Sequence, residues 1–180
     1  CLSKDPYLLN YSFKKFNLKA SMSLEARKIS EKVVKEIFQS CNKFLKKNNI
    51  NSLKSKIFIS GIAFKGDPET SDIRGSTAID LIKIFQKKKF KDIYLHDFCA
   101  NHVELKEFGK ISSSFSSGCS NSNIIIIMNN NKKYLDVNLI ESLKNIKKPC
   151  LIYDSWNVLN PEVIKDKDYI KYKSIGKVSV

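Results

Sequence analysis

Short apolar runs alternate with amphipathic segments through most of this chain, and that alternation narrows the folds open to it. Two of the runs, residues 56–60 and 123–128, are almost wholly apolar, as expected for strands buried on both faces of a sheet. The predicted strands are 56–60, 92–96, 123–128, 150–153 and 169–175, and the predicted helices between them are 75–88, 101–108 and 136–145. The serine-rich stretch 112–122 is predicted to be a loop. Strands that alternate with helices predict an α/β fold, built on a parallel sheet with helices on both faces.

A long helix is predicted ahead of the sheet, from Ser21 to Lys47. Apolar residues recur there at steps of three and four and form one broad stripe, which needs a partner surface. The stripe contains Met22, Ala26, Ile29, Val33, Val34, Ile37, Phe38, Cys41, Phe44 and Leu45. Its partner is either the chain's own α/β region or a second copy of the chain, and the sequence leaves both open. We therefore expect two parts, a helical segment of residues 1–50 and an α/β domain of residues 51–180.

The net charge of +14 favours anionic partners such as nucleic acid, nucleotides or an anionic surface. Among the 32 basic residues, however, the only arginines are Arg27 and Arg74, whereas nucleic-acid interfaces favour arginine. The lysines are also spread along the whole chain. We therefore attribute the charge to compositional bias and expect no nucleic-acid partner, although a basic nucleic-acid-binding module is the alternative that the charge supports.

Two further classes of protein fit the sequence poorly. No apolar run approaches the roughly 20 residues that span a membrane, and the N-terminus does not have the pattern of a signal peptide. Five cysteines at scattered spacings do not form a disulfide framework, and they favour a cytoplasmic protein with reduced thiols: Cys1, Cys41, Cys99, Cys119 and Cys150. The chain does not begin with methionine, so we expect it to be part of a longer protein.

The segment Gly61–Pro68 matches the first part of a phosphate-binding P-loop. A P-loop continues with lysine and then serine or threonine, which contact the phosphates and Mg²⁺. Asp67 and Pro68 stand at those two positions, and a carboxylate would repel phosphate. The sequence therefore does not predict a P-loop.

Other near matches are weaker. Asp97 follows the second predicted strand, where dinucleotide-binding folds often hold a ribose, but the G-x-G-x-x-G fingerprint is absent. His96, Cys99 and His102 have the spacing of metal ligands, yet they are only three, and a structural zinc site has four. We expect no metal site.

Three segments follow predicted strands at the edge where parallel sheets bind their ligands: 63–66, 128–130 and 154–157. Within the first loop, Lys65 could bind a phosphate as a point charge. Arg74 could bind a second phosphate together with the N-terminus of the helix that follows. The alternative is a network of ion pairs between these cations and the carboxylates of the same loop, and spacing alone does not separate the two interpretations.

The first residues of the chain combine a thiol, a cation and a carboxylate. Cys1 precedes Asp5 by four residues, with Lys4 between them. A nearby cation or a helix N-terminus favours the reactive thiolate. If a helix begins here, Cys1 and Asp5 lie one turn apart on one face, an arrangement that suits covalent catalysis.

Three segments together resemble the C-terminal part of the nucleotide-sugar 6-dehydrogenases, the UDP-glucose/GDP-mannose dehydrogenase family. Cys1–Tyr7 resembles the catalytic-cysteine motif of that family, and Gly61–Gly66 with Asp72–Ser76 resembles its G-x-A-F-K…D-x-R-x-S signature. Ile152–Asn157 is similar to the late D-x-R-N segment, with Trp156 where the family commonly carries arginine. Order and spacing agree over nearly the whole chain.

The resemblance implies a reaction and a domain plan. It implies that the parent protein oxidises the 6-hydroxyl of a UDP-sugar to a carboxylate with NAD, in polysaccharide biosynthesis. The substrate would be UDP-glucose or, on the motif variants, a UDP-N-acetylhexosamine. The long helix would form a homodimer, and the Rossmann-like α/β domain would bind UDP. NAD would be bound mainly by an N-terminal domain outside this chain, so the chain alone is expected to be inactive.

The resemblance also assigns roles to individual residues. Cys1 would be the nucleophile, passing through a thiohemiacetal and a thioester, and Asp5 would orient or activate water. For the substrate, the implied contacts are Phe64, Lys65 and Trp156. For the cofactor, the implied contacts are Lys4 near the nicotinamide and Arg74 on the pyrophosphate.

Overall fold

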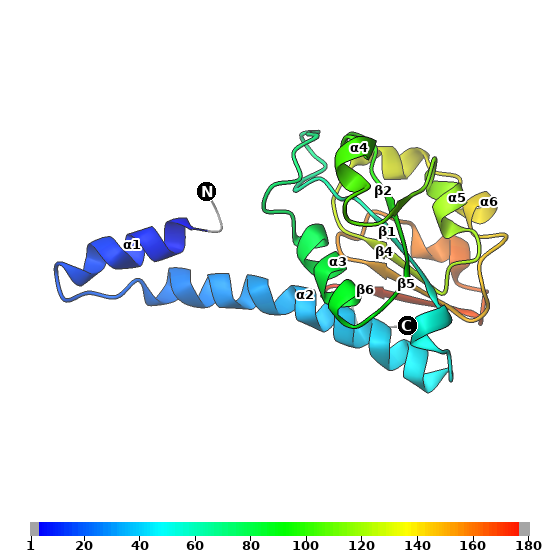
Figure 1. Cartoon of the computed structure of the whole chain (residues 1–180), viewed down its shortest axis with the longest axis horizontal. Coiled ribbons are helices and arrows are strands. Elements are labelled where there is room, and N and C mark those ends of the chain that lie inside the picture. The colour runs from blue at the N-terminus through cyan, green and yellow to red at the C-terminus, as the bar shows by residue number, and fades with distance from the viewer. Residues whose placement is uncertain (1–3, 177–180) are drawn as a thin grey trace.

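Among residues 4–176, which the computed structural model describes, six strands form one sheet. The strands are β1 (Lys56–Ser60), β2 (Asp92–His96), β3 (Lys110–Ile111), β4 (Ile124–Ile127), β5 (Cys150–Asp154) and β6 (Ile170–Ser174). They lie in the order β3-β2-β1-β4-β5-β6, and every neighbouring pair is parallel. The predicted α/β fold with a Rossmann-like parallel sheet is therefore confirmed (Figure 1).

Helices cover both faces of this sheet, as predicted. One face carries α2 (Ser21–Lys47), α3 (Thr77–Lys87) and α4 (His102–Leu105), and the other carries α5 (Phe115–Cys119) and α6 (Leu139–Ser142). Three short 3-10 helices lie in the connections, η1 (Ser52–Lys54), η2 (Lys132–Asp136) and η3 (Pro161–Ile164). Among residues 4–176, no helix combines the length and the apolar character needed to cross a membrane.

The central strand β4 explains why its sequence is apolar at every position. Successive side chains of a strand point to opposite faces. Ile124 and Ile126 join the core beneath α2 and α3, and Ile125 and Ile127 join the core beneath α5 and α6. All four are fully buried. A strand covered on both faces has no position for a polar side chain, so the isoleucines run without interruption.

The long helix α2 divides its apolar stripe between two environments. Toward its C-terminus, Ile37, Cys41 and Leu45 are almost completely buried against the α/β unit. Toward its N-terminus, Met22 is 87% exposed and Ile29 is 61% exposed. Packing on the chain's own domain therefore accounts for the C-terminal half of the stripe only.

A second helix, α1 (Asp5–Lys14), folds back beside the N-terminal half of α2, and the two project from the α/β unit as an arm (Figure 1). Two side-chain contacts join the helices of this arm. The Tyr7 hydroxyl donates to Glu31 Oε1 over 3.4 Å, and the Ala20 backbone N–H donates to Asn10 Oδ1 over 3.2 Å. None of the residues of α1 is buried.

The prediction of a loop for the serine-rich stretch 112–122 is wrong, because α5 (Phe115–Cys119) lies within this stretch. Ser114 and Ser117 form a capping box: Ser114 Oγ accepts from Ser117 N, and Ser117 Oγ accepts from Ser114 N, each over 3.1 Å. A helix of five residues is too short to display a helical repeat. The two-residue strand β3 is likewise too short to be predicted from alternation.

We expect Ile37→Ala to lower the free energy of unfolding by about 2–4 kcal/mol, because truncation leaves a cavity between α2 and the sheet. Ile140→Ala is the matched control, since Ile140 on α6 is 55% exposed and its truncation should cost less than about 0.5 kcal/mol. Urea unfolding at a fixed protein concentration measures both. Equal losses in the two variants would contradict the packing of α2 on the α/β unit.

Candidate functional site

The direction in which the chain adds strands reverses between β1 and β4. From β1 the chain proceeds outward through β2 to β3, and from β4 it proceeds the other way through β5 to β6. Ligands of doubly wound sheets bind at the carboxyl ends of the strands at such a switch point. The loops of residues 61–76, after β1, and 128–131, after β4, meet there.

A buried aspartate holds this edge of the sheet together. Asp97 directly follows β2 and is 4% exposed. Its Oδ2 accepts from Ala63 N over 2.8 Å, which ties it to the loop after β1. Its Oδ1 accepts from Cys99 N over 2.7 Å and from Ala100 N over 2.8 Å. Both carboxylate oxygens are thus engaged by backbone N–H groups of the protein, which does not favour the ribose contact considered for Asp97.

Lys65 is the cation of this edge that no carboxylate neutralises in the described part of the chain. Its side chain is half-buried, and its Nζ lies 5.5 Å from the centroid of the Phe64 ring. Phe64 itself is 45% exposed. The three carboxylates of the same loop pair with other cations: Asp67 with Lys132 (3.1 Å), Glu69 with Lys133 (3.1 Å) and Asp72 with Arg74 (2.7 Å). Of the two cations considered from the sequence, Arg74 therefore pairs with a carboxylate of its own loop, whereas Lys65 does not within the described residues.

Arg74 is paired with Asp72 and is still accessible. Its Nε donates to Asp72 Oδ1 over 3.0 Å, and its Nη2 donates to Asp72 Oδ2 over 2.7 Å. These bonds hold the pKa of the Asp72 carboxyl at about 2. The Arg74 side chain remains 89% exposed. The pairing thus orients the guanidinium just ahead of α3 while leaving most of it open to an anion.

Trp156 lies on the loop after β5 and is held against the end of β4. Its Nε1 donates to the Met128 carbonyl over 3.0 Å, and the residue as a whole is 52% exposed. The start of this loop is fixed by Asp154, which is fully buried and accepts from Trp156 N over 3.1 Å and from Leu159 N over 2.8 Å. One edge of the indole is therefore anchored, and the ring is available to a ligand.

The N-terminal candidates are not joined to this edge by a described contact. Lys4 precedes α1 and Asp5 begins it, and both are exposed on the arm. Between residues 4 and 176, no hydrogen bond or ion pair links either of them to the loop of residues 61–76. Cys1 lies outside the described residues.

Other cysteines of the chain do not have the properties of a nucleophile. Burial raises the pKa of Cys41 to about 12, and it also raises the pKa values of Cys99, Cys119 and Cys150. A thiol with a raised pKa is less often the reactive thiolate at neutral pH.

Three buried polar side chains near the site, those of Ser60, His96 and Tyr134, are joined by hydrogen bonds that the sequence pattern does not predict. Ser60 Oγ lies 3.0 Å from His96 Nδ1 and 2.7 Å from the Tyr134 hydroxyl. The Phe98 ring packs edge-on against His96, with centroids 4.8 Å apart. Burial lowers the pKa of His96 to about 4, so the imidazole is neutral at pH 7. The available signal is Ser60, a polar residue that directly follows three buried apolar residues of β1.

The spacing of His96, Cys99 and His102 is not matched by a metal-binding geometry. In the part of the chain that the structure describes, no group of three or more His, Cys, Asp or Glu side chains could hold a metal ion. His96 Nδ1 is instead bonded to Ser60.

The sequence and the fold agree with a known family. The family model described as the UDP-binding domain of the UDP-glucose/GDP-mannose dehydrogenase family matches residues 58–161. This chain belongs to that family. A comparison with curated proteins gives no significant match.

Solved structures of nucleotide-sugar dehydrogenases have the same fold. The UDP-D-ManNAc dehydrogenase of Pyrococcus horikoshii is 23% identical, with a TM-score of 0.77 over 98% of this chain and 38% of that one. The NDP-N-acetyl-D-galactosaminuronic acid dehydrogenase of Methanosarcina mazei Go1 is 21% identical, with a TM-score of 0.79 over 98% and 38%. The GDP-mannose dehydrogenase of Pseudomonas aeruginosa is 17% identical, with a TM-score of 0.61 over 86% and 35%. This chain thus spans well under half the length of each.

We expect the free energy of unfolding to depend on the pH through His96. The folded pKa of about 4 lies below the unfolded value of about 6.5. The fold therefore favours the neutral imidazole, and the contribution of His96 to the free energy of unfolding is fully present above pH 6.5. It should fall by about 1.4 kcal/mol per pH unit as the pH drops from 6.5 toward 4. Urea unfolding across this range measures the slope.

His96→Gln removes the titrating group, so its slope over the same pH range should be shallower by about that amount. The comparison of slopes does not depend on how much the substitution itself destabilises the protein. Parallel slopes for the parent and the variant would rule out a buried neutral His96.

Proposed function

We propose that this chain is the C-terminal part of an NAD-dependent UDP-sugar 6-dehydrogenase and that its α/β domain binds the UDP part of the substrate. The observation that carries the proposal is Lys65, a half-buried cation at the switch point of the sheet with no described carboxylate partner. A half-buried lysine at this edge that has no described carboxylate partner can pair with an anionic ligand. A diphosphate fits that requirement, and the match to a UDP-binding family model supports it.

The neighbouring side chains suit the rest of such a ligand. The exposed faces of Phe64 and Trp156 offer apolar surfaces for the planar base or the sugar ring. Arg74, oriented by Asp72, supplies a second accessible cation ahead of α3. In the proposal, Phe64, Lys65 and Trp156 contact the UDP-sugar, and Arg74 contacts the pyrophosphate of NAD.

The chemistry of the proposal depends on the N-terminal motif. Oxidation of the 6-hydroxyl gives an aldehyde, and the Cys1 thiolate adds to its carbonyl carbon to form a thiohemiacetal. Loss of the second hydride gives a thioester. Water, oriented by Asp5, then hydrolyses the thioester, so that the carboxylate leaves and the thiol is regenerated. NAD, when bound, would accept one hydride in each oxidation, so that two molecules of NAD are reduced per substrate. The assignment of Cys1 rests on its motif, and the raised pKa values of the four described cysteines do not favour any of them as an alternative nucleophile.

In this proposal, few residues of this chain contact NAD. Arg74 and Lys4 are exposed cations that fit a pyrophosphate and the nicotinamide side, respectively, and no other NAD contact is proposed here. The chain spans 38% of the length of two of its structural relatives. We therefore expect the remaining NAD contacts to come from another part of the protein and the 180-residue chain alone to oxidise no substrate.

The helical arm supports dimerisation as part of the same proposal. Its exposed apolar residues lie on both helices and include Leu8, Tyr11, Met22 and Ile29. Such a surface is costly to leave in water, and the matching arm of a second copy would cover it. We further expect the dimer to work in polysaccharide biosynthesis, as the family resemblance implies. We expect it in the cytoplasm because the described cysteines are free thiols, as in reducing compartments.

We expect the full-length protein to bind UDP and Lys65→Ala to weaken that binding about tenfold to a hundredfold, because a charge-assisted contact to phosphate is lost. Lys54→Ala is the control, since Lys54 is exposed at the opposite edge of the sheet. Isothermal titration calorimetry measures the affinities. The proposal fails if the parent does not bind UDP at millimolar concentration, and retention of nucleic acid at low salt would then favour the alternative basic module.

We expect Ile29→Asp to convert the dimer to a monomer, because the substitution places a charge in the apolar surface of the arm. Val103→Asp is the matched control, as Val103 is 71% exposed on α4, away from the arm. Sedimentation equilibrium over a range of concentrations measures the oligomeric state. A parent that stays monomeric, or an Ile29→Asp protein that stays dimeric, would refute a dimer formed through the arm.

A further inference from the structure

Three consecutive asparagines, residues 129–131, follow β4, and each side chain bonds to a different part of the loop that follows β1. The chain is rich in asparagine, so the run could reflect composition alone. Burial argues otherwise: Asn129 is 1% exposed and Asn131 is 3% exposed. Buried amides are retained in a fold only when their hydrogen bonds are made, so these side chains have a structural task.

The first amide connects the ends of three strands. Asn129 Nδ2 lies 3.4 Å from both the Ala63 carbonyl and Asp97 Oδ2. It therefore links the end of β4 to the loop after β1 and to the carboxylate after β2. A Cβ at Gly61 would lie 2.7 Å from the Asn129 backbone nitrogen, so a glycine is needed for this close approach.

The second amide holds the backbone immediately after Lys65. Asn130 Oδ1 accepts from Gly66 N over 3.0 Å and from Asp67 N over 3.2 Å. The two loops touch here, because a Cβ at Gly66 would lie 2.1 Å from the Asn131 nitrogen. Since Ala63 is fixed on one side and Gly66 on the other, Lys65 has little freedom in where its side chain begins.

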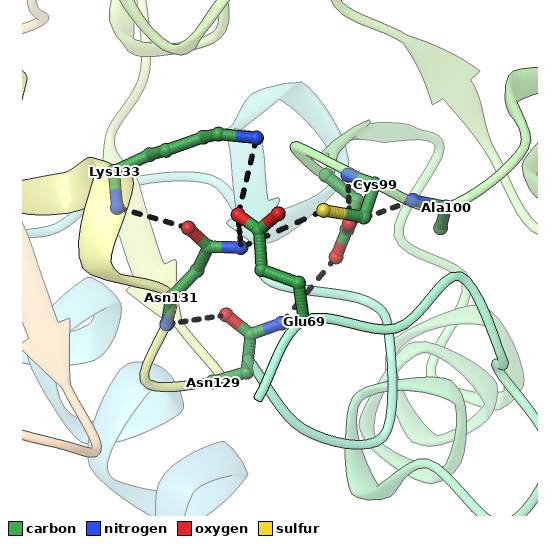
Figure 2. Close-up of polar contacts among 7 residues, drawn as sticks. Glu69, Cys99, Ala100, Asn129, Asn131 and Lys133 are labelled. Atoms are coloured by element: carbon green, nitrogen blue, oxygen red, sulfur yellow. Dashed lines mark hydrogen bonds and ion pairs between the residues drawn. The ribbon is translucent and has the colours of Figure 1, made fainter. Parts of the chain in front are cut away.

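The third amide fixes the far end of the loop. Asn131 Nδ2 donates to Glu69 Oε1 over 3.2 Å, and Glu69 also pairs with Lys133 over 3.1 Å (Figure 2). Asn131 Oδ1 accepts from Lys133 N over 2.9 Å, which closes the group (Figure 2). The loop is thus held in order at residues 63, 66–67 and 69 by three successive side chains.

We propose that Asn130 is a positioning residue of the UDP site, which acts by fixing the backbone from which Lys65 extends. The inference rests on the function proposed above, since it assigns to Asn130 the placement of the cation that meets the diphosphate. Asn130 is the best placed of the three because its acceptor bonds adjoin Lys65 directly. It is also only half-buried, so its truncation leaves room for water and should spare the fold.

A double-mutant cycle between Asn130 and Lys65 tests this, with UDP affinity measured by calorimetry in the full-length protein. Asn130→Ala should weaken UDP binding about tenfold in the parent background, the equivalent of one to two backbone hydrogen bonds. In the Lys65→Ala background the same substitution should change the affinity by less than about twofold, because the group that it positions is gone. Hydrogen exchange at the amides of Gly66 and Asp67 should become faster.

Asn51→Ala is the matched control. Asn51 Oδ1 also accepts from a backbone N–H, that of Leu53 over 2.9 Å, but at the opposite edge of the sheet. Its loss should affect stability in a similar way and leave the UDP affinity unchanged. If Asn130→Ala does not fold, Asn130→Ser carries the same cycle.

The outcomes separate the two proposals. An unchanged affinity in Asn130→Ala, or an equal loss in both Lys65 backgrounds, overturns the positioning role while the UDP site stands. Absence of UDP binding in the parent overturns the proposed function and the positioning role with it. A tenfold loss that disappears without Lys65 supports both.

Discussion

The carboxyl edge of the sheet depends on one buried carboxylate, that of Asp97. Parallel strands end side by side, but the loops that leave them have no strand pairing to hold them in place. Asp97 accepts from Ala63 N of the loop after β1 and from Cys99 N and Ala100 N of its own turn. Charge-assisted bonds to backbone N–H groups are among the stronger ones, and a buried carboxylate without them would be costly. The same carboxylate thus stabilises the turn after β2 and fixes the start of the loop that carries the candidate site.

On the other side of the switch point, a second buried carboxylate holds the loop that follows β5. Asp154, at the end of β5, accepts from Trp156 N and Leu159 N, and from the Tyr172 hydroxyl over 2.9 Å. Between the two aspartates, the asparagines after β4 connect the loops. The candidate ligand-binding residues are Phe64, Lys65 and Trp156. Each lies within three residues of a backbone group that is held by one of these hydrogen bonds. Rigid support of that kind is what a site needs if its cation and its ring surfaces are to meet one ligand together.

How much could be predicted from the sequence differed from one part of the chain to another. Strands β1, β4 and β5 and helix α2 were predictable because burial on both faces demands apolar runs, and burial on one face demands a helical stripe. Lys65 and Arg74 were identifiable as cations after β1. The bonds of Asn130, and of Ser60 with His96 and Tyr134, were not, because they join residues separated by 36 to 74 positions. No local pattern records such a pairing.

The sequence by itself determined the α/β class, the parallel sheet and the family, since these follow from periodicity and from short motifs in a fixed order. Only the tertiary structure decided which charges are free. Spacing allowed Lys65 and Arg74 equally to bind phosphate or to join ion pairs; the folded loop pairs Arg74 with Asp72 and leaves Lys65 unpaired among residues 4–176. Likewise, the apolar stripe of α2 reads the same along its length, but its C-terminal half is buried and its N-terminal half is exposed. The physical reason is common to both cases: burial and pairing depend on which distant segments approach, and a one-dimensional pattern holds only the local preferences.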